Sequence, residues 1–169
     1  MKQSEQSKVW MIDALSTLLK TKEYRAITIK DITSKAGISR LTFYRNFESK
    51  EDIIRYHMER GFREYMEELR TVPDLELRQM IALCYKNWER HKVDIQMLTS
   101  QNMGWLLREP FETFLQAVLK QMELEEKYTY FQIQFLIGGM FSDMLAWLND
   151  PQGRKPDDIA QEIMAIIQK

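Results

Sequence analysis

The chain has little of several residues that other protein classes need. Its 169 residues include one cysteine, Cys84, so no disulfide can form within the chain, and a small disulfide-stabilised secreted domain is excluded. Six glycines and four prolines are few, as expected for an all-helical protein. The only histidines, His57 and His91, lie in charged helical contexts, and no His-Glu-x-x-His or Cys-x-x-Cys spacing is present. We therefore expect no metal site and no cofactor.

Motifs of catalysis, membrane insertion and export are also missing. There is no Gly-x-Ser-x-Gly elbow, Gly-x-Gly-x-x-Gly turn or P-loop, and we expect no catalytic residues. The longest apolar stretch, 135–141, is far shorter than a membrane span. Residues 1–8 lack the apolar core of a signal peptide. These absences, with the single cysteine, predict a soluble cytoplasmic protein that does not contact a membrane.

Apolar residues recur at helical spacing along most of the chain, and no strand-like alternation persists. A hydrophobic fraction of 44% argues against disorder. The pattern predicts an all-α fold of about nine helices, at about 6–20, 28–36, 39–47, 49–70, 76–91, 93–101, 105–122, 126–148 and 156–168. The segment 71–74 indicates a break between domains. We predict an N-terminal three-helix domain at 1–50, a linking helix at 49–70, and a C-terminal helical domain for ligand binding and dimerisation at 51–169.

Positive charge is concentrated in one part of the chain. The formal net charge is −1, but residues 20–50 hold eight Lys or Arg against three Asp or Glu. A solvated basic face would give the same count. A site for phosphate also requires it.

The span 28–50 combines this charge with a helix-turn-helix pattern. Thr28 can cap one helix, Gly37 can take the left-handed conformation that ends it, and Ser39 can cap the next. Phe43 and Phe47 then face inward at i and i+4, which turns the polar side chains of the second helix outward. A short helix that exposes arginines is suited to the major groove of DNA.

The same residues carry a resemblance to the DNA-binding domain of the TetR family of bacterial transcriptional regulators, over residues 7 to 55. The matching residues are Ile27-Thr28, Ile32, Ala36-Gly37-Ile38-Ser39, Thr42-Phe43-Tyr44, Phe47 and Ser49-Lys50-Glu51-Asp52. Leu41 departs from the family, whose members most often carry a small residue there. The resemblance implies a homodimeric repressor that binds a palindromic double-stranded DNA operator and is released by a small-molecule effector. Some relatives act instead as coactivators or adaptors through a protein partner, and this alternative stays open.

Ten residues are predicted to contact DNA. By resemblance, Thr28, Thr42, Tyr44 and Lys50 hold phosphates. Base reading falls to Arg40, Leu41 and Arg45, with Asn46 and Lys30 as further candidates. Ser39, the cap of the second helix, completes the set.

Two further sites are predicted in the C-terminal domain. The helix from 126 is apolar on more than one face, and Gly138-Gly139 in its middle indicates a close backbone approach. With the last helix it is expected to form a dimer interface of Phe135, Gly138, Gly139, Phe141, Leu145, Trp147, Ile159, Ile163 and Ile166, although the two helices could instead complete a monomer core. Residues 126–168 also resemble the C-terminal domain of a TetR subgroup common in Firmicutes. An apolar or aromatic effector is expected against Tyr85, Trp88, Met97, Met103, Trp105, Phe111 and Phe114, all of which could equally be plain core.

Overall fold

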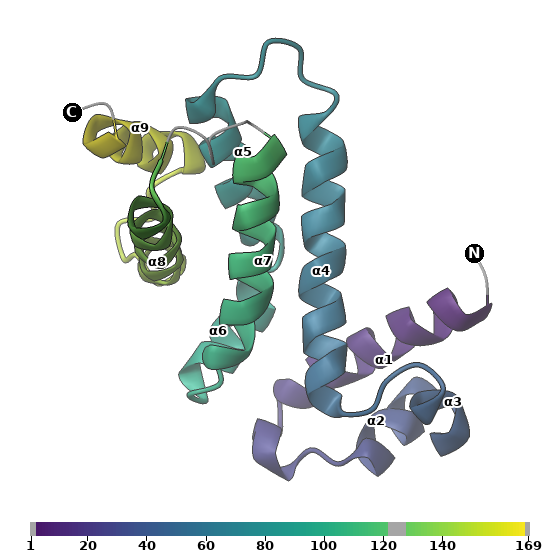
Figure 1. The fold of residues 1–169 in the computed structure, drawn as a ribbon. Helices are drawn as coiled ribbons and strands as arrows, with labels where there is room; N and C mark the ends of the chain where they lie inside the picture. Colours follow the sequence, from purple (N-terminus) through teal and green to yellow (C-terminus); the bar gives the residue numbers. More distant parts are fainter. Residues whose placement is uncertain (1–2, 122–127, 168–169) are drawn as a thin grey trace. The chain divides into compact units, whose positions relative to one another are not determined.

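The computed structural model describes residues 3–121 and 128–167. Within these ranges the chain forms nine α-helices and one short 3₁₀ helix, with no strand, so the all-α prediction is confirmed (Figure 1). The helices are α1 (Gln3–Leu19), η1 (Tyr24–Ala26), α2 (Ile29–Ala36), α3 (Arg40–Tyr44), α4 (Lys50–Leu69), α5 (Leu77–Arg90), α6 (Lys92–Ser100), α7 (Trp105–Gln121), α8 (Tyr130–Leu148) and α9 (Pro156–Ile167).

The chain divides into two units that are interleaved along the sequence. Unit 1 comprises 1–59 and 93–110, and unit 2 comprises 60–92 and 111–169. Helices α4 and α7 therefore each contribute residues to both units. The sequence predicts two consecutive domains divided at residue 50, whereas unit 1 also takes in α6 and the beginning of α7.

Unit 1 is built on the packing of α1 against α2, with α3 following after a turn (Figure 1). Ile32 of α2 and Phe43 of α3 are completely buried, and Phe47 is nearly so. The Phe43 and Phe47 ring centroids are 6.3 Å apart. These contacts fix the short α3, because a five-residue helix has too few backbone hydrogen bonds to be stable alone.

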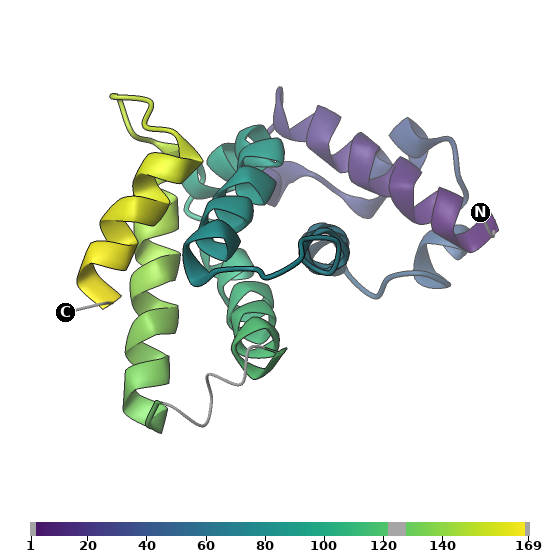
Figure 2. The same ribbon diagram turned by 90° about the horizontal axis from the view of Figure 1, so that it is seen from above.

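Unit 2 has an aromatic centre. The Phe62 ring of α4 stacks on Phe114 of α7 with centroids 4.1 Å apart, and Tyr65 meets Phe114 edge-on. Trp88 of α5 is 1% exposed and its ring packs against Phe62. Helix α9 packs against α5 and runs beside α8 (Figure 2). Large buried aromatic groups of this kind supply much of the apolar burial in a small domain.

The structure corrects some predicted element bounds. The second helix of the helix-turn-helix ends at Tyr44, so Phe47 lies beyond it and still reaches the core. Helix α8 begins at Tyr130 with Thr129 as its cap, later than expected. Of the predicted earlier start, 126–127 lie outside the described residues. The 3₁₀ helix η1 was not predicted.

Candidate nucleic-acid interface

The first helix of the motif is fixed at its N-terminus by a capping box. Thr28 Oγ1 accepts a hydrogen bond from the Asp31 backbone N–H at 3.2 Å, and Asp31 Oδ2 accepts one from the Thr28 N–H at 2.8 Å. Lys22 Nζ lies 2.8 Å from the same carboxylate. This Lys22 hydrogen bond, followed by the contacts from Thr28, holds the pKa of Asp31 well below its usual range. The carboxylate therefore stays ionised, and α2 begins at a defined residue.

The turn between the two helices has the predicted geometry. Gly37 has φ 67° and ψ 30°, the left-handed conformation that costs little without a Cβ. Ser39 Oγ then accepts the Thr42 N–H at 3.0 Å and caps α3. These two local features, together with buried Phe43, set the direction in which α3 presents its remaining side chains.

The outer face of α3 carries the side chains expected to meet DNA. Leu41 is 61% exposed and Tyr44 is 58% exposed, although both could have packed into a core. Arg40 and Arg45 are also exposed, and in the described part of the chain neither has an ion-pair partner. Lys30, on the outside of α2, is likewise exposed. This face can offer donors for phosphate or guanine and an apolar surface for a thymine methyl group.

Asn46 and Thr42 are more restrained than the arginines. Asn46 Nδ2 donates to the Thr42 carbonyl at 2.8 Å, and its Oδ1 accepts from Ser4 Oγ at 2.6 Å. The Thr42 hydroxyl lies 2.9 Å from that of Ser39. These side chains help to shape the end of α3, and they can reach DNA only by giving up or sharing these bonds.

Lys50 occupies a position that the sequence did not reveal. Its Nζ donates to the carbonyls of Tyr24 and Ile27 at 2.7 and 2.9 Å, and lies 4.2 Å from the centre of the Tyr24 ring. Burial lowers the pKa of Lys50. The Tyr24 hydroxyl in turn donates to Glu51 at 2.8 Å. Two of the three ammonium donors thus hold η1 against the start of α4, and one remains for a phosphate.

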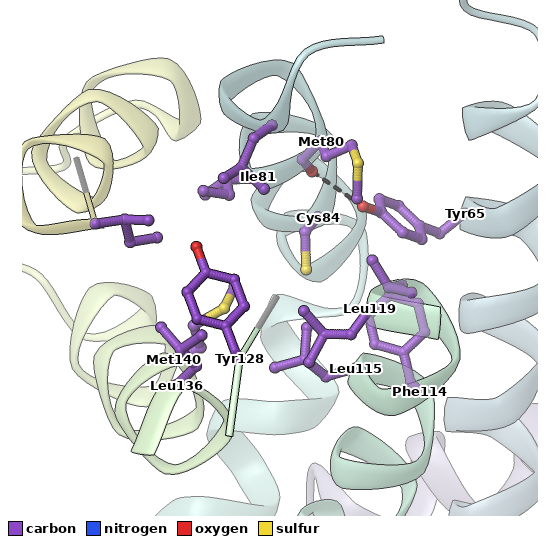
Figure 3. Close-up of a pocket in the computed structure, with 13 residues that line it drawn as sticks. Tyr65, Met80, Ile81, Cys84, Phe114, Leu115, Leu119, Tyr128, Leu136 and Met140 are labelled. Atoms are coloured by element: carbon purple, nitrogen blue, oxygen red, sulfur yellow. Dashed lines mark hydrogen bonds between the residues drawn. The ribbon is translucent and has the colours of Figure 1, made fainter. Parts of the chain in front are cut away.

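Unit 2 contains an apolar cavity of about 50 Å³. Helices α4, α5, α7, α8 and α9 contribute to its lining (Figure 3). Of the seven residues predicted to contact an effector, only Phe114 lines it. Tyr85, Trp88 and Phe111 are buried in the core of unit 2, where Tyr85 meets the Trp147 ring and Trp88 meets Phe111.

The other three predicted effector residues lie in unit 1. Met103 is buried there, Met97 is half-buried, and Trp105 is 62% exposed. The cavity residues that the sequence analysis missed include Met80, Cys84 and Met140. Their signal was weak, because helical spacing predicts burial in the same way whether a residue lines a void or fills the core.

The residues predicted for the dimer interface fall into two groups. Phe135 and Ile166 are 76% and 73% exposed, Gly138 and Gly139 are exposed, and Phe141, Leu145 and Ile163 are half-buried. Trp147 and Ile159 are buried within the protomer instead. Trp147 Nε1 donates to the Arg154 carbonyl at 2.7 Å, which ties α8 to the loop before α9. These two side chains therefore complete the protomer core and offer no surface to a partner.

The described residues hold no group of three or more His, Cys, Asp or Glu side chains placed to bind a metal ion. Over residues 3–121 and 128–167, no helix is both long enough and apolar enough to cross a membrane.

Comparison with known proteins identifies the N-terminal region. Residues 11–56 match the family model described as bacterial regulatory proteins, tetR family. The chain is also 43% identical over 44 residues to YvkB of Bacillus subtilis (strain 168), described as an uncharacterized HTH-type transcriptional regulator. That match covers 26% of this chain and only 23% of the length of YvkB. The family and this relative are transcriptional regulators.

Solved structures share the fold over nearly the whole chain. Lin0861 from Listeria innocua matches with a TM-score of 0.85 at 14% identity, covering 99% of this chain and 92% of that one. A TetR transcriptional regulator from Streptococcus agalactiae 2603V matches with a TM-score of 0.67 at 22% identity, covering 98% and 96%. At these identities the likeness shows the fold. By its N-terminal domain, the chain belongs to the tetR family of bacterial regulatory proteins.

Proposed function

We propose that this chain is a sequence-specific transcriptional repressor that binds a palindromic operator as a homodimer and is released by a small-molecule effector. The observation that carries the proposal is the outer face of α3. Two unpaired guanidinium groups and two large exposed side chains stand on a helix whose opposite side is completely buried. Exposing Leu41 and Tyr44 to water has no evident benefit to folding, whereas both are useful against DNA.

The contacts divide the face into reading and holding roles. Arg40 and Arg45 can each bind guanine O6 and N7 through two donors, a pairing that contributes about 1–3 kcal/mol of discrimination. Leu41 can pack on a thymine methyl group. Thr28 lies at the N-terminus of α2, where backbone N–H groups favour a phosphate. Lys50 combines its remaining donor with its structural bonds, so its phosphate contact depends on the position of η1.

Dimerisation is supported by the exposed face of α8. Phe131 is 80% exposed and Phe135 is 76% exposed, one turn apart on the same face. Gly138, Ser142 and Ala146 continue this face with small side chains, all exposed. Aromatic groups beside small residues allow a second helix to approach closely and bury a large apolar area. A two-fold dimer would place two α3 helices in successive major grooves and would explain a palindromic site.

The test is selection of bound duplexes from a random DNA pool by the full-length protein, repeated with Arg45→Ala and with Arg25→Ala as a matched control. Arg25 is exposed on η1 and lies outside α3. The wild type should select a two-fold symmetric sequence. Arg45→Ala should lose preference at one base pair in each half-site, while Arg25→Ala should keep the same selected sequence. Equal changes in base preference for both variants would contradict the reading role of α3.

The adaptor alternative predicts a different result in the same experiment. An adaptor would enrich no DNA sequence, and a pull-down from cell extract would instead recover a protein partner. A reporter gene placed behind the selected site separates the remaining alternatives. A repressor lowers its expression and an activator raises it.

A further inference from the structure

We propose that the effector is an uncharged, apolar small molecule that binds in the cavity of unit 2, and that the site rejects carboxylates of the same size. This inference rests on the proposed function and names the ligand class of its regulatory site. It moves the site away from six of the seven residues expected from the sequence and onto the facing surfaces of α5, α7 and α8 (Figure 3).

The chemistry of the lining carries the ligand class. In the described part of the chain, no charged side chain lines the cavity, and the polar side-chain atoms there belong to Tyr65, Cys84 and Tyr128. The Tyr65 hydroxyl already donates to the Met80 carbonyl at 3.0 Å (Figure 3). Burial raises the pKa of Cys84 to about 12, so its thiol stays neutral. A carboxylate here would lose its hydration without gaining a cation, which is strongly unfavourable.

The size of the cavity explains how such a ligand can act on the protein. A cavity of about 150 Å³ is known to hold benzene, whereas the space here is about 50 Å³. Even a single aromatic ring must therefore displace the walls. Met80 and Met140 are flexible enough to move first, and α8 is open on its outer side, since Leu136 and Met140 are only half-buried. A ligand that fits only a widened cavity favours the conformation with separated helices.

The binding test uses toluene and benzoate as a matched pair of probes on the full-length dimer. Toluene should bind saturably with one molecule per protomer in ligand-observed NMR, and benzoate should bind at least tenfold more weakly. Cys84 is the only cysteine, so its reaction with a thiol reagent reports on the cavity. Toluene should slow that reaction and benzoate should not. Benzoate binding as tightly as toluene would overturn the proposed ligand class.

Two variants locate the site. Leu136→Trp places a larger side chain at the half-buried edge of the cavity and should weaken toluene binding at least tenfold. Ile133→Trp makes a similar change on the same helix at a half-buried residue outside the lining, and should leave binding unchanged. Circular dichroism confirms that both fold. Equal toluene affinity in both variants would overturn the assignment.

A DNA-retention assay without toluene separates the two proposals. If the protein binds its selected DNA but toluene fails to bind or to protect Cys84, this inference is overturned and the DNA-binding proposal stands. If DNA is not bound, the proposed function fails, whatever toluene does.

Discussion

Replacing Gly138 and Gly139 of α8 by alanine should stabilise the isolated protomer and weaken the dimer. A methyl group at either position would meet no atom within 4 Å in the protomer, and neither glycine has a positive φ. The close backbone approach that the sequence predicts is thus absent inside the protomer. If these glycines have a packing role, a second copy of the chain must provide it.

The magnitudes follow from helix propensity and packing. Glycine is about 0.8–1.0 kcal/mol less favourable than alanine in a helix interior, so the double variant should gain about 2 kcal/mol of protomer stability. At a closely packed interface, by contrast, added methyl groups cost typically about 1–3 kcal/mol. Two-fold symmetry introduces each methyl twice. We therefore expect the dimer dissociation constant to rise about tenfold or more, since each 1.4 kcal/mol is a factor of about ten.

The assay is sedimentation equilibrium for the dimer, with urea unfolding at a protein concentration low enough to populate the monomer. Thr113→Ala is the control, because Thr113 is exposed on α7 and gains helix propensity away from the α8 face. The control should keep the wild-type dissociation constant. A double glycine variant that gains stability while dimerising as tightly as the wild type would refute the placement of this face at the interface.

Three further changes test individual contacts. Lys50→Ala should lower the free energy of unfolding by about 1–2 kcal/mol, because two backbone carbonyls lose their donor; unchanged urea unfolding would contradict this role. Asp31 has a depressed pKa, chiefly through its hydrogen bond from Lys22, so its stabilising effect is full above about pH 4 and is lost as the pH falls further. Asp31→Asn should therefore show a shallower loss of stability on acidification than the wild type, and parallel pH profiles would argue against the capping role. Tyr65→Phe should cost about 1 kcal/mol through the hydrogen bond to the Met80 carbonyl and leave DNA affinity unchanged, and a large loss of affinity would show that this bond has another role.

Much of the fold could be predicted because local signals and helical spacing agreed. Thr28, Gly37 and Ser39 each have the capping or turn conformation expected of them. Thr129 and Gln132 form a capping box that marks the start of α8, a signal present in the sequence that the prediction passed over. The 3₁₀ helix η1 could not be predicted, because it depends on distant partners. Tyr24 N–H donates to Gln101 Oε1, and its carbonyl accepts from Lys50.

The candidate sites were predictable to different degrees. The α3 face follows from alternating buried and exposed positions around Phe43, so its arginines could be named in advance. The cavity could not, because its location depends on where side chains from five helices fail to fill space. Trp147 was assigned to a dimer interface because it is apolar on an apolar helix. Its indole N–H instead binds the Arg154 carbonyl within the same protomer.

The central claim is that two copies of this chain read one symmetric DNA site through α3. The most direct measurement is a salt titration of binding to DNA flanking its own gene, with the stoichiometry determined at saturation. The account predicts two protomers per palindromic site and log affinity that falls steeply and linearly with log salt, as released counterions require. Binding no stronger than to random duplex at low salt, or one protomer per site, would contradict it.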